Sequence, residues 1–132
     1  QRQMCIREET QQYGIREVGI SDYNLITENN VIGNATGGIY KVGTNTIVKR
    51  NIGYTTENSG TATFIGDGTK TSFNIAHGLV TTPSYWSVEE ASSAAGAAEI
   101  SYATASSSSI TVNFKSAPSS SSTVIVSWYA EV

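Results

Sequence analysis

The sequence predicts an all-β protein in which the last coils of a parallel β-solenoid are followed by a small antiparallel β-sandwich. Three observations predict this fold class. The composition favours strands and turns over helices, and the first half contains a repeat of about two dozen residues. The second half alternates apolar and polar residues with the period of a β-strand.

Residues that form strands and turns are abundant throughout the chain. Ser (18), Thr (16), Gly (12) and Asn (9) fill 55 of the 132 positions, well above their ordinary usage. These residues are poor helix formers and are frequent in strands, turns and corners. We therefore expect little helix.

The same composition excludes several classes of function. No apolar run approaches the roughly 18–20 residues that span a bilayer, so we expect no membrane insertion. A pI near 5.0 and a formal charge of −3 argue against nucleic acid as a partner. One Cys and one His cannot form an internal disulfide or a zinc cluster, and we expect no metal site and no cofactor.

The distribution of charge divides the chain into two candidate domains, residues 1–57 and residues 58–132. The first carries six basic and six acidic groups, whereas the second carries two basic and five acidic groups. The shift falls near the turn-forming sequence NSG at 58–60. Because the chain begins with Gln1, we expect either a processed product or a fragment of a longer protein.

The first half repeats two blocks in the same order. GIREVG at 14–19 recurs as GIYKVG at 38–43, and NLI at 24–26 with NV at 30–31 recurs as NTI at 45–47 with NI at 51–52, at offsets of 24 and 21. Short apolar bursts between Gly and Asn predict brief strands, with Gly or Asn in left-handed conformation at the corners. Units of this kind stacked on each other form a β-solenoid.

Residues 12–57 resemble the last coils of a right-handed parallel β-helix of the pectate-lyase-like type. The resemblance rests on NLITENNVIGN at 24–34 and NTIVKRNIGY at 45–54. Those proteins have many coils, so the resemblance implies the terminal part of a longer β-helix. Ordinary antiparallel hairpins with Gly and Asn turns are the alternative interpretation of the same pattern.

The second half predicts five or six short strands, which together form a small sandwich or barrel, jelly-roll-like in its size and strand content. The Asp-Gly pair of GDG at 66–68 lies between two strand-like runs and predicts a hairpin. Further strands are expected at 85–90, 99–103, 110–115 and 124–130, with turn-rich segments at 77–83, 92–96, 106–109 and 118–122.

Residues 59–132 resemble, in the order of their motifs, a small C-terminal domain of viral and phage tailspike or surface-spike proteins. The motifs are GTATFIGDG at 60–68, FNIAHGL at 73–79, and ITVNF at 110–114 before WYA at 128–130. That family has no shared catalytic constellation. The resemblance implies a structural or receptor-contacting cap that forms a homo-oligomer, with a trimer favoured.

Few residues are candidates for chemistry. His77 lies in a turn after a strand without a nucleophile motif, so we expect a structural role. Cys5 is expected to be a buried or incidental thiol, with an intermolecular bridge as the alternative. Glu17, Asp22 and Glu28 do not reproduce a recognisable acid pair. They are expected to be solvated surface charges, with a sugar or cation contact as the alternative, and no catalytic residue is predicted.

The candidate glycan contacts are aromatic residues in two adjacent pairs, Tyr85 with Trp86 and Trp128 with Tyr129. Neighbours in a strand face opposite ways, so one member of each pair should enter the core and the other should be exposed. An exposed ring can stack on a sugar or fill a subunit interface, and the core-plus-interface role is the favoured alternative. Asn34, in the sequence NAT at 34–36, is a candidate glycosylation site.

Together these inferences favour a structural and adhesive component of a virion tail spike or fibre-like appendage. It is expected to cap and oligomerise a β-helix at the virion surface or outside the cell, to contact host-surface polysaccharide, and not to be an enzyme. The alternatives are a self-assembling extracellular filament subunit and the non-catalytic end of a polysaccharide-degrading β-helix enzyme.

Overall fold

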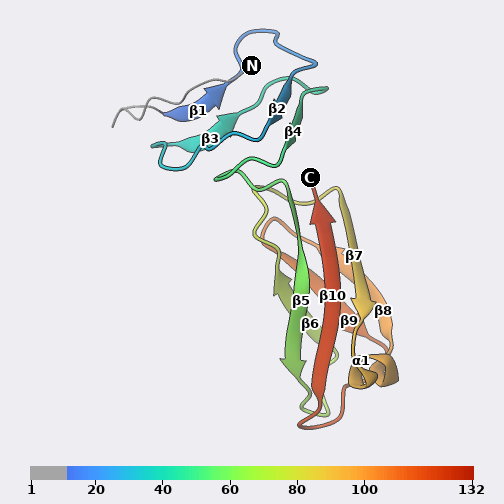
Figure 1. The fold of residues 1–132 in the computed structure, drawn as a ribbon. Helices are drawn as coiled ribbons and strands as arrows, with labels where there is room; N and C mark the ends of the chain where they lie inside the picture. Colours follow the sequence, from blue (N-terminus) through green and yellow to red (C-terminus); the bar gives the residue numbers. More distant parts are fainter. Residues whose placement is uncertain (1–11) are drawn as a thin grey trace. The chain divides into compact units, whose positions relative to one another are not determined.

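The computed structural model describes residues 12–132, which divide into two compact units. One unit ends at Thr56 and the other comprises Glu57–Val132, so the division lies one residue before the boundary expected from the charge distribution. Within the described residues the chain is all-β apart from one short helix, as the composition predicts (Figure 1).

The first unit contains four short strands that pair in parallel. They are β1 (Tyr13–Arg16), β2 (Leu25–Thr27), β3 (Gly37–Tyr40) and β4 (Ile47–Lys49). β1 pairs with β3 and β2 pairs with β4 (Figure 1), so the two copies of the repeat lie beside each other in the same direction. The alternative of antiparallel hairpins is therefore wrong for these four strands.

The register of the second pair corrects the sequence alignment by one residue. β1 and β3 pair at the predicted offset of 24, because Ile15 lies opposite Ile39. β2 and β4 pair at an offset of 22 rather than 21, because Ile26 lies opposite Val48. A slip of one residue would place Ile26, which is 7% exposed, opposite Ile47, which is 51% exposed. In a strand such a slip turns side chains to the other face, so burial selects the observed register.

Two glycines allow the interior of this unit to close. Val31 is buried in a small core with Ile26 and Ile39. A Cβ atom added to Gly14 would lie 2.8 Å from the Val31 side chain, and one added to Gly38 would lie 2.5 Å from it. Both distances are shorter than carbon atoms tolerate, so the absence of a side chain at these positions lets the backbone approach Val31.

The corners of this unit differ from the expected Gly and Asn. Gly33 and Gly53 have φ of 83° and 86°, but Glu28 and Arg50 also have φ of 59° and 52°. No Asn of the described chain has a positive φ, and Asn34 and Asn51 of this unit instead form hydrogen bonds through their side chains. Glu28 and Arg50 occupy matching corners of the two repeats. The Glu28 amide donates to the Arg50 carbonyl at 3.2 Å, and their exposed side chains form an ion pair at 3.1 Å.

The second unit is a sandwich of two antiparallel three-stranded sheets (Figure 1). One sheet has the order β5-β10-β7 and the other has the order β6-β9-β8. The strands are β5 (Glu57–Ile65), β6 (Ser72–Ala76), β7 (Tyr85–Glu90), β8 (Ile100–Ala105), β9 (Ser109–Phe114) and β10 (Thr123–Glu131). A jelly roll has eight strands, so this unit is a small sandwich and not a jelly roll.

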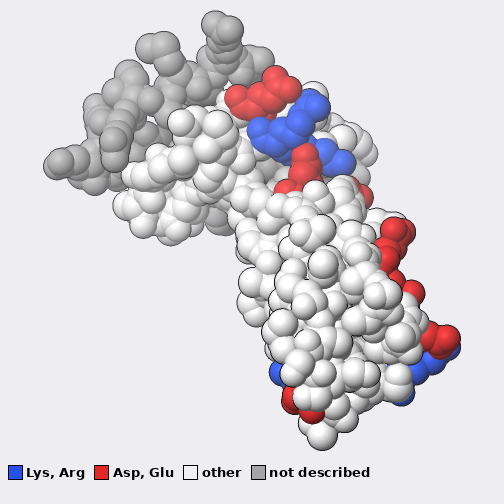
Figure 2. All heavy atoms as spheres, turned by 60° about the horizontal axis from the view of Figure 1, so that its bottom comes forward, with Lys and Arg blue, Asp and Glu red and all other residues white. Residues whose placement is uncertain are grey.

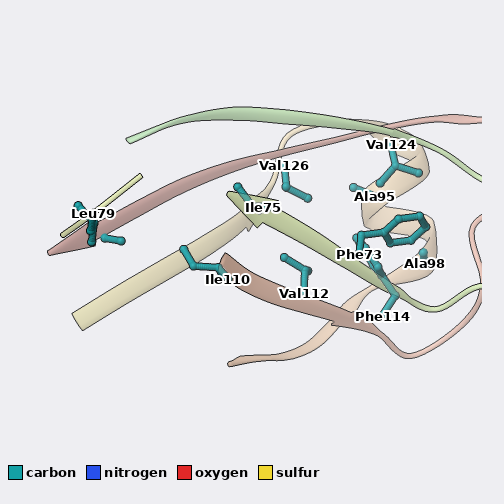
Figure 3. Packing of buried hydrophobic residues seen from close by; sticks show 11 residues of the cluster. Phe73, Ile75, Leu79, Ala95, Ala98, Ile110, Val112, Phe114, Val124 and Val126 are labelled. Atoms are coloured by element: carbon teal, nitrogen blue, oxygen red, sulfur yellow. The ribbon is translucent and has the colours of Figure 1, made fainter. Parts of the chain in front are cut away.

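The core of the sandwich lies between the two sheets. Figure 3 shows Phe73 and Val112 of the β6-β9-β8 sheet in one packed cluster with Val124 and Val126 of β10. The predicted alternation is confirmed in β9, where Ile110, Val112 and Phe114 are buried and the residues between them are partly exposed. Hydrophobic burial between the sheets is the main stabilising contribution in such a small unit.

The Asp-Gly turn does not connect a hairpin, contrary to the sequence prediction. β5 and β6, which flank it, belong to different sheets, so the segment between them crosses from one sheet to the other. Asp67 accepts hydrogen bonds from the amides of Thr69 and Lys70, and its loop bonds to the segment at 118–122 through the backbone of Gly66. The turn forms locally, but β5 pairs with β10, and its partly buried Ala62 and Phe64 pack against the core between the sheets.

The segment at 92–96, predicted as a turn, begins the short helix α1 (Ser93–Ala98). Ser92 is the N-cap, because its hydroxyl accepts a hydrogen bond from the amide of Ala95 at 3.2 Å. Ala95 and Ala98 are buried against the end of the sandwich core (Figure 3). Alanine is the best helix former, and its small side chain fits where the sheets close.

Candidate functional site

The strongest candidate site is an exposed pair of tyrosines on the outer face of the β5-β10-β7 sheet. Tyr85 begins β7 and Tyr129 lies near the end of β10, and they are 54% and 36% exposed. Their ring centroids are 6.1 Å apart with planes inclined at 56°. Antiparallel pairing of β7 with β10 brings the two rings together although they are far apart in sequence.

The tryptophans of the two aromatic pairs face the interior. Trp86 and Trp128 are partly buried and pack against the sandwich core, so the predicted alternation within each pair is confirmed. The Trp86 indole also donates a hydrogen bond to the carbonyl of Ala103 at 3.3 Å, which links the two sheets. Of the four glycan-contact candidates, Tyr85 and Tyr129 are therefore the two that present large exposed rings.

A carboxylate orders the tyrosine pair. The Tyr129 hydroxyl donates a hydrogen bond of 2.6 Å to Glu131, two residues further along the same face of β10. This hydrogen bond, together with desolvation and the negative charges of Glu131 and Glu57, raises the pKa of Tyr129 to about 12. Tyr129 is thus a neutral, oriented ring at any physiological pH. Glu131 lies opposite Tyr85 on one side and Glu57 on the other, which places the three residues in one row across the sheet.

Hydroxyl side chains surround the tyrosine pair. Tyr129 lies opposite Ser59 of β5 and Ser87 of β7, and residues directly opposite each other in antiparallel strands share a face. Ser127 of β10 is on the same face, two residues before Tyr129. Hydroxyl groups both donate and accept hydrogen bonds, so this face combines two rings with the polar groups that could match a sugar.

His77 has the structural role that the sequence predicts. Its side chain is fully buried; Nδ1 accepts a hydrogen bond from the Leu79 amide at 3.0 Å, and Nε2 lies 3.0 Å from the Ser106 carbonyl. Since a carbonyl only accepts, Nε2 carries the proton and the imidazole is neutral. Gly78, with φ of 67°, completes the turn between these partners.

Glu17 corrects the prediction that the acidic residues of the first unit are solvated surface charges. It is only 6% exposed, and its carboxylate accepts four hydrogen bonds: from the Thr46 hydroxyl at 2.5 Å, the Asn24 side chain at 2.7 Å, and the amides of Val42 and Gly43 at 2.8 and 2.9 Å. The bonds from Thr46 and Gly43 are the largest causes that outweigh desolvation and lower the pKa of Glu17 to about 2.

Asp22 and Glu28 differ from Glu17 in their surroundings. Asp22 accepts hydrogen bonds from the backbone and side chain of Asn45 at 2.8 Å each, and the side-chain bond is the main cause that lowers the pKa of Asp22. Glu28 is exposed in its ion pair with Arg50. The sequence signal for the Glu17 network was weak, because Lys41 occupies the equivalent position of the second repeat and the carboxylate is not itself repeated.

The remaining candidates carry no binding geometry. The Asn34 side-chain amide, which a glycan would have to modify, donates a hydrogen bond of 2.7 Å to the Val31 carbonyl and is partly buried. Cys5 lies outside the described residues. Residues 12–132 contain no group of three or more metal-ligating side chains, and no helix in this part of the chain has the length and apolarity to cross a membrane.

The fold and the site define an all-β protein with a two-sheet sandwich and an exposed tyrosine pair. Comparison of the chain with protein-family models, with curated proteins and with solved structures finds no match.

Proposed function

We propose that the chain is an end segment of a virion tail spike or fibre-like appendage. In this proposal residues 12–56 are coils of a right-handed parallel β-helix, and residues 57–132 form a cap that contacts host-surface glycans. The observation that carries the proposal is the parallel pairing of two sequence repeats at offsets of 24 and 22 residues. Coils of a β-helix stack in this way, because every coil uses the same edges and the same interior positions as its neighbour.

An asparagine ladder gives further support for stacked coils. Asn29 and Asn51 occupy equivalent positions, and the Asn51 side-chain oxygen accepts hydrogen bonds from the backbone and side chain of Asn29, each at 3.0 Å. The Asn51 amide nitrogen in turn donates to the carbonyl of Ile26 at 2.9 Å. Stacks of identical amide side chains recur where parallel strands repeat in register. Strands of three or four residues gain stability from such stacking rather than from their length.

The tyrosine pair supports an adhesive role for the second unit. Tyr85 and Tyr129 present oriented, exposed rings beside hydroxyl side chains. Tyrosine rings stack on the apolar faces of sugars and lose little conformational entropy on binding, which makes them effective contact residues. The strands that carry these rings pair along most of their length, so the contact face is built on a rigid element.

The proposal assigns no catalytic role to the chain. A general acid for glycoside cleavage requires a carboxyl group with a raised pKa, so that it is protonated near neutral pH. Glu17 has the opposite property, since its pKa is lowered to about 2 and each of its oxygens accepts two hydrogen bonds. Its chemistry fits a link between repeats better than proton transfer.

A self-assembling filament subunit is the second candidate, and one observation favours it. Several large apolar side chains of the first unit are highly exposed, among them Ile20 at 101%, Tyr23 at 81% and Leu25 at 70%. Such residues commonly mark a contact surface. Light scattering coupled to size exclusion separates the two candidates. The appendage proposal expects a discrete homo-oligomer, preferably a trimer, whereas a concentration-dependent series of larger assemblies would favour the filament.

The adhesive role is tested by glycan binding. We expect the chain to bind members of a glycan array, and we expect Tyr85→Ala to reduce that binding at least about tenfold through loss of one stacking ring. Tyr102→Ala is the matched control, because Tyr102 is 58% exposed but lies on β8 of the other sheet. Equal binding by both variants and the unchanged chain would contradict a contact through the tyrosine pair.

A further inference from the structure

We infer that the face carrying Tyr85 and Tyr129 selects uncharged sugar chains and rejects acidic ones such as uronates, sialates and sulfated glycans. This inference rests on the proposed glycan contact and names the class of ligand that the face accepts. It follows from the distribution of charge over the β5-β10-β7 sheet, considered together with the exposed rings.

Carboxylates surround the tyrosine pair. Glu131 lies between Tyr85 and Glu57 in register, and its side chain holds the Tyr129 hydroxyl. Glu89 lies opposite Ser127, two residues from Tyr129 on the same face of β10. A sugar ring stacked on either tyrosine would therefore lie close to several negative charges, and a carboxylate or sulfate on that sugar would be repelled.

Within the second unit, this sheet carries no Lys or Arg to offset these carboxylates. Residues 57–132 contain only two such residues, Lys70 and Lys115. Lys115 is paired with Glu99 beside the other sheet at 2.5 Å, and the Lys70 ammonium lies 5.2 Å from the ring centroid of Phe73. On the face drawn in Figure 2, red atoms follow one edge of the lower part of the molecule, and blue atoms accompany red ones at its lower end. Acidic ligands are usually bound by Arg or Lys, and this sheet supplies neither.

Uncharged sugars have the groups that this face can satisfy. The rings of Tyr85 and Tyr129 can stack on the C–H faces of a pyranose, while Ser59, Ser87 and Ser127 present hydroxyls for its hydroxyl groups. The oxygen of Glu131 that does not hold Tyr129 remains an acceptor for a sugar hydroxyl. The negatively charged Glu131 carboxylate accepts a hydrogen bond from a neutral sugar hydroxyl but repels an anionic sugar. Charge on the binding face thus produces specificity.

The test compares pairs of related glycans in which one member carries acidic groups and the other does not. Fully methyl-esterified and de-esterified galacturonan oligomers form one pair, dextran and dextran sulfate form a second, and asialo and sialylated N-glycans form a third. We expect binding to the neutral member of at least one pair, and binding about tenfold weaker or more to its acidic partner at low ionic strength. A combined Glu57→Gln and Glu89→Gln variant leaves Glu131 and both tyrosines intact. In this variant the ratio of neutral-glycan affinity to acidic-glycan affinity should fall severalfold.

The possible outcomes distinguish failure of the proposed selectivity from failure of the proposed glycan contact. Preferential binding of an acidic member, lost in Tyr85→Ala, would overturn the inference while leaving the glycan contact in place. An unchanged neutral-to-acidic ratio in the Glu57→Gln and Glu89→Gln variant would also overturn it. Absence of binding to every polymer, by a chain whose Trp86 and Trp128 fluorescence shows native burial, would overturn both the contact and its selectivity.

Discussion

The Glu17 carboxylate accepts a 2.5 Å hydrogen bond from the hydroxyl of Thr46, which lies 29 residues further along the chain in the second repeat. The Thr46 hydroxyl oxygen in turn accepts a hydrogen bond from the backbone amide of Asn24 at 3.3 Å. One buried carboxylate and one hydroxyl thus join the strands of both repeats. Hydrogen bonds to an ionised group are stronger than neutral ones, so this contact is a main link within the first unit.

Acid should weaken the first unit through Glu17. Because folding lowers the pKa of Glu17 from 4.5 to about 2, its contribution is complete above pH 4.5 and is lost as the pH falls towards 2. Hydrogen exchange of peptides from residues 12–56 should show lower protection factors across that window, after correction for the slower intrinsic amide exchange in acid. Glu17→Gln should lower the stability of the first unit at neutral pH. It should also reduce the change in that stability between pH 4.5 and about pH 2. Glu28→Gln, at an exposed ion pair, should leave the dependence unchanged.

Asn51→Ala should destabilise the first unit strongly. The buried Asn51 amide bonds to the carbonyls of Ile26 and Lys49 and to the backbone and side chain of Asn29. Its removal leaves several buried polar groups without partners, which should cost about 2–3 kcal/mol in the free energy of unfolding. Asn30→Ala is the control, since Asn30 is exposed and makes one local bond to Ile32. Equal losses from both substitutions would argue against the ladder.

His77→Ala should destabilise the sandwich by about 3 kcal/mol, because it leaves a cavity and removes the partners of Leu79 and Ser106. Denaturant unfolding monitored by tryptophan fluorescence reports on this unit, since Trp86 and Trp128 both belong to it. His77→Gln, which retains a donor and an acceptor, should lose less. A loss below about 0.5 kcal/mol for His77→Ala would contradict the structural role.

Tyr129 should ionise about two pH units later than an ordinary tyrosine, with a pKa of about 12 instead of 10.0. Ultraviolet titration of the chain and of Tyr129→Phe isolates its signal by difference. Folding favours the protonated phenol, so this contribution to stability is complete below pH 10 and is lost as the pH rises through 12. Glu131→Gln keeps an acceptor but removes the charge, so it should shift the Tyr129 titration towards its ordinary value.

Composition and pattern were enough to predict the class of fold and most strands. Turn and strand formers predicted an all-β chain, and the two-residue period located the strands that the structure shows as β9 and β10. Alternation also predicted one buried and one exposed ring in each aromatic pair, and the structure shows that Tyr85 and Tyr129 are the exposed members. These features depend on the two-residue period of a strand, which is a local property.

Tertiary structure decided which strands pair and what the polar side chains do. The Asp67-Gly68 turn formed as a local pattern allows, yet β5 joined β10 instead of β6, because burial of the inner faces of the two sheets outweighs the preference of one turn. The offset of 22, the burial of Glu17, and the meeting of Tyr85 with Tyr129 likewise depend on residues distant in sequence. Local propensity depends on residues that are close in sequence. Packing and hydrogen bonding also depend on residues that are distant in sequence, and only folding brings those residues into contact.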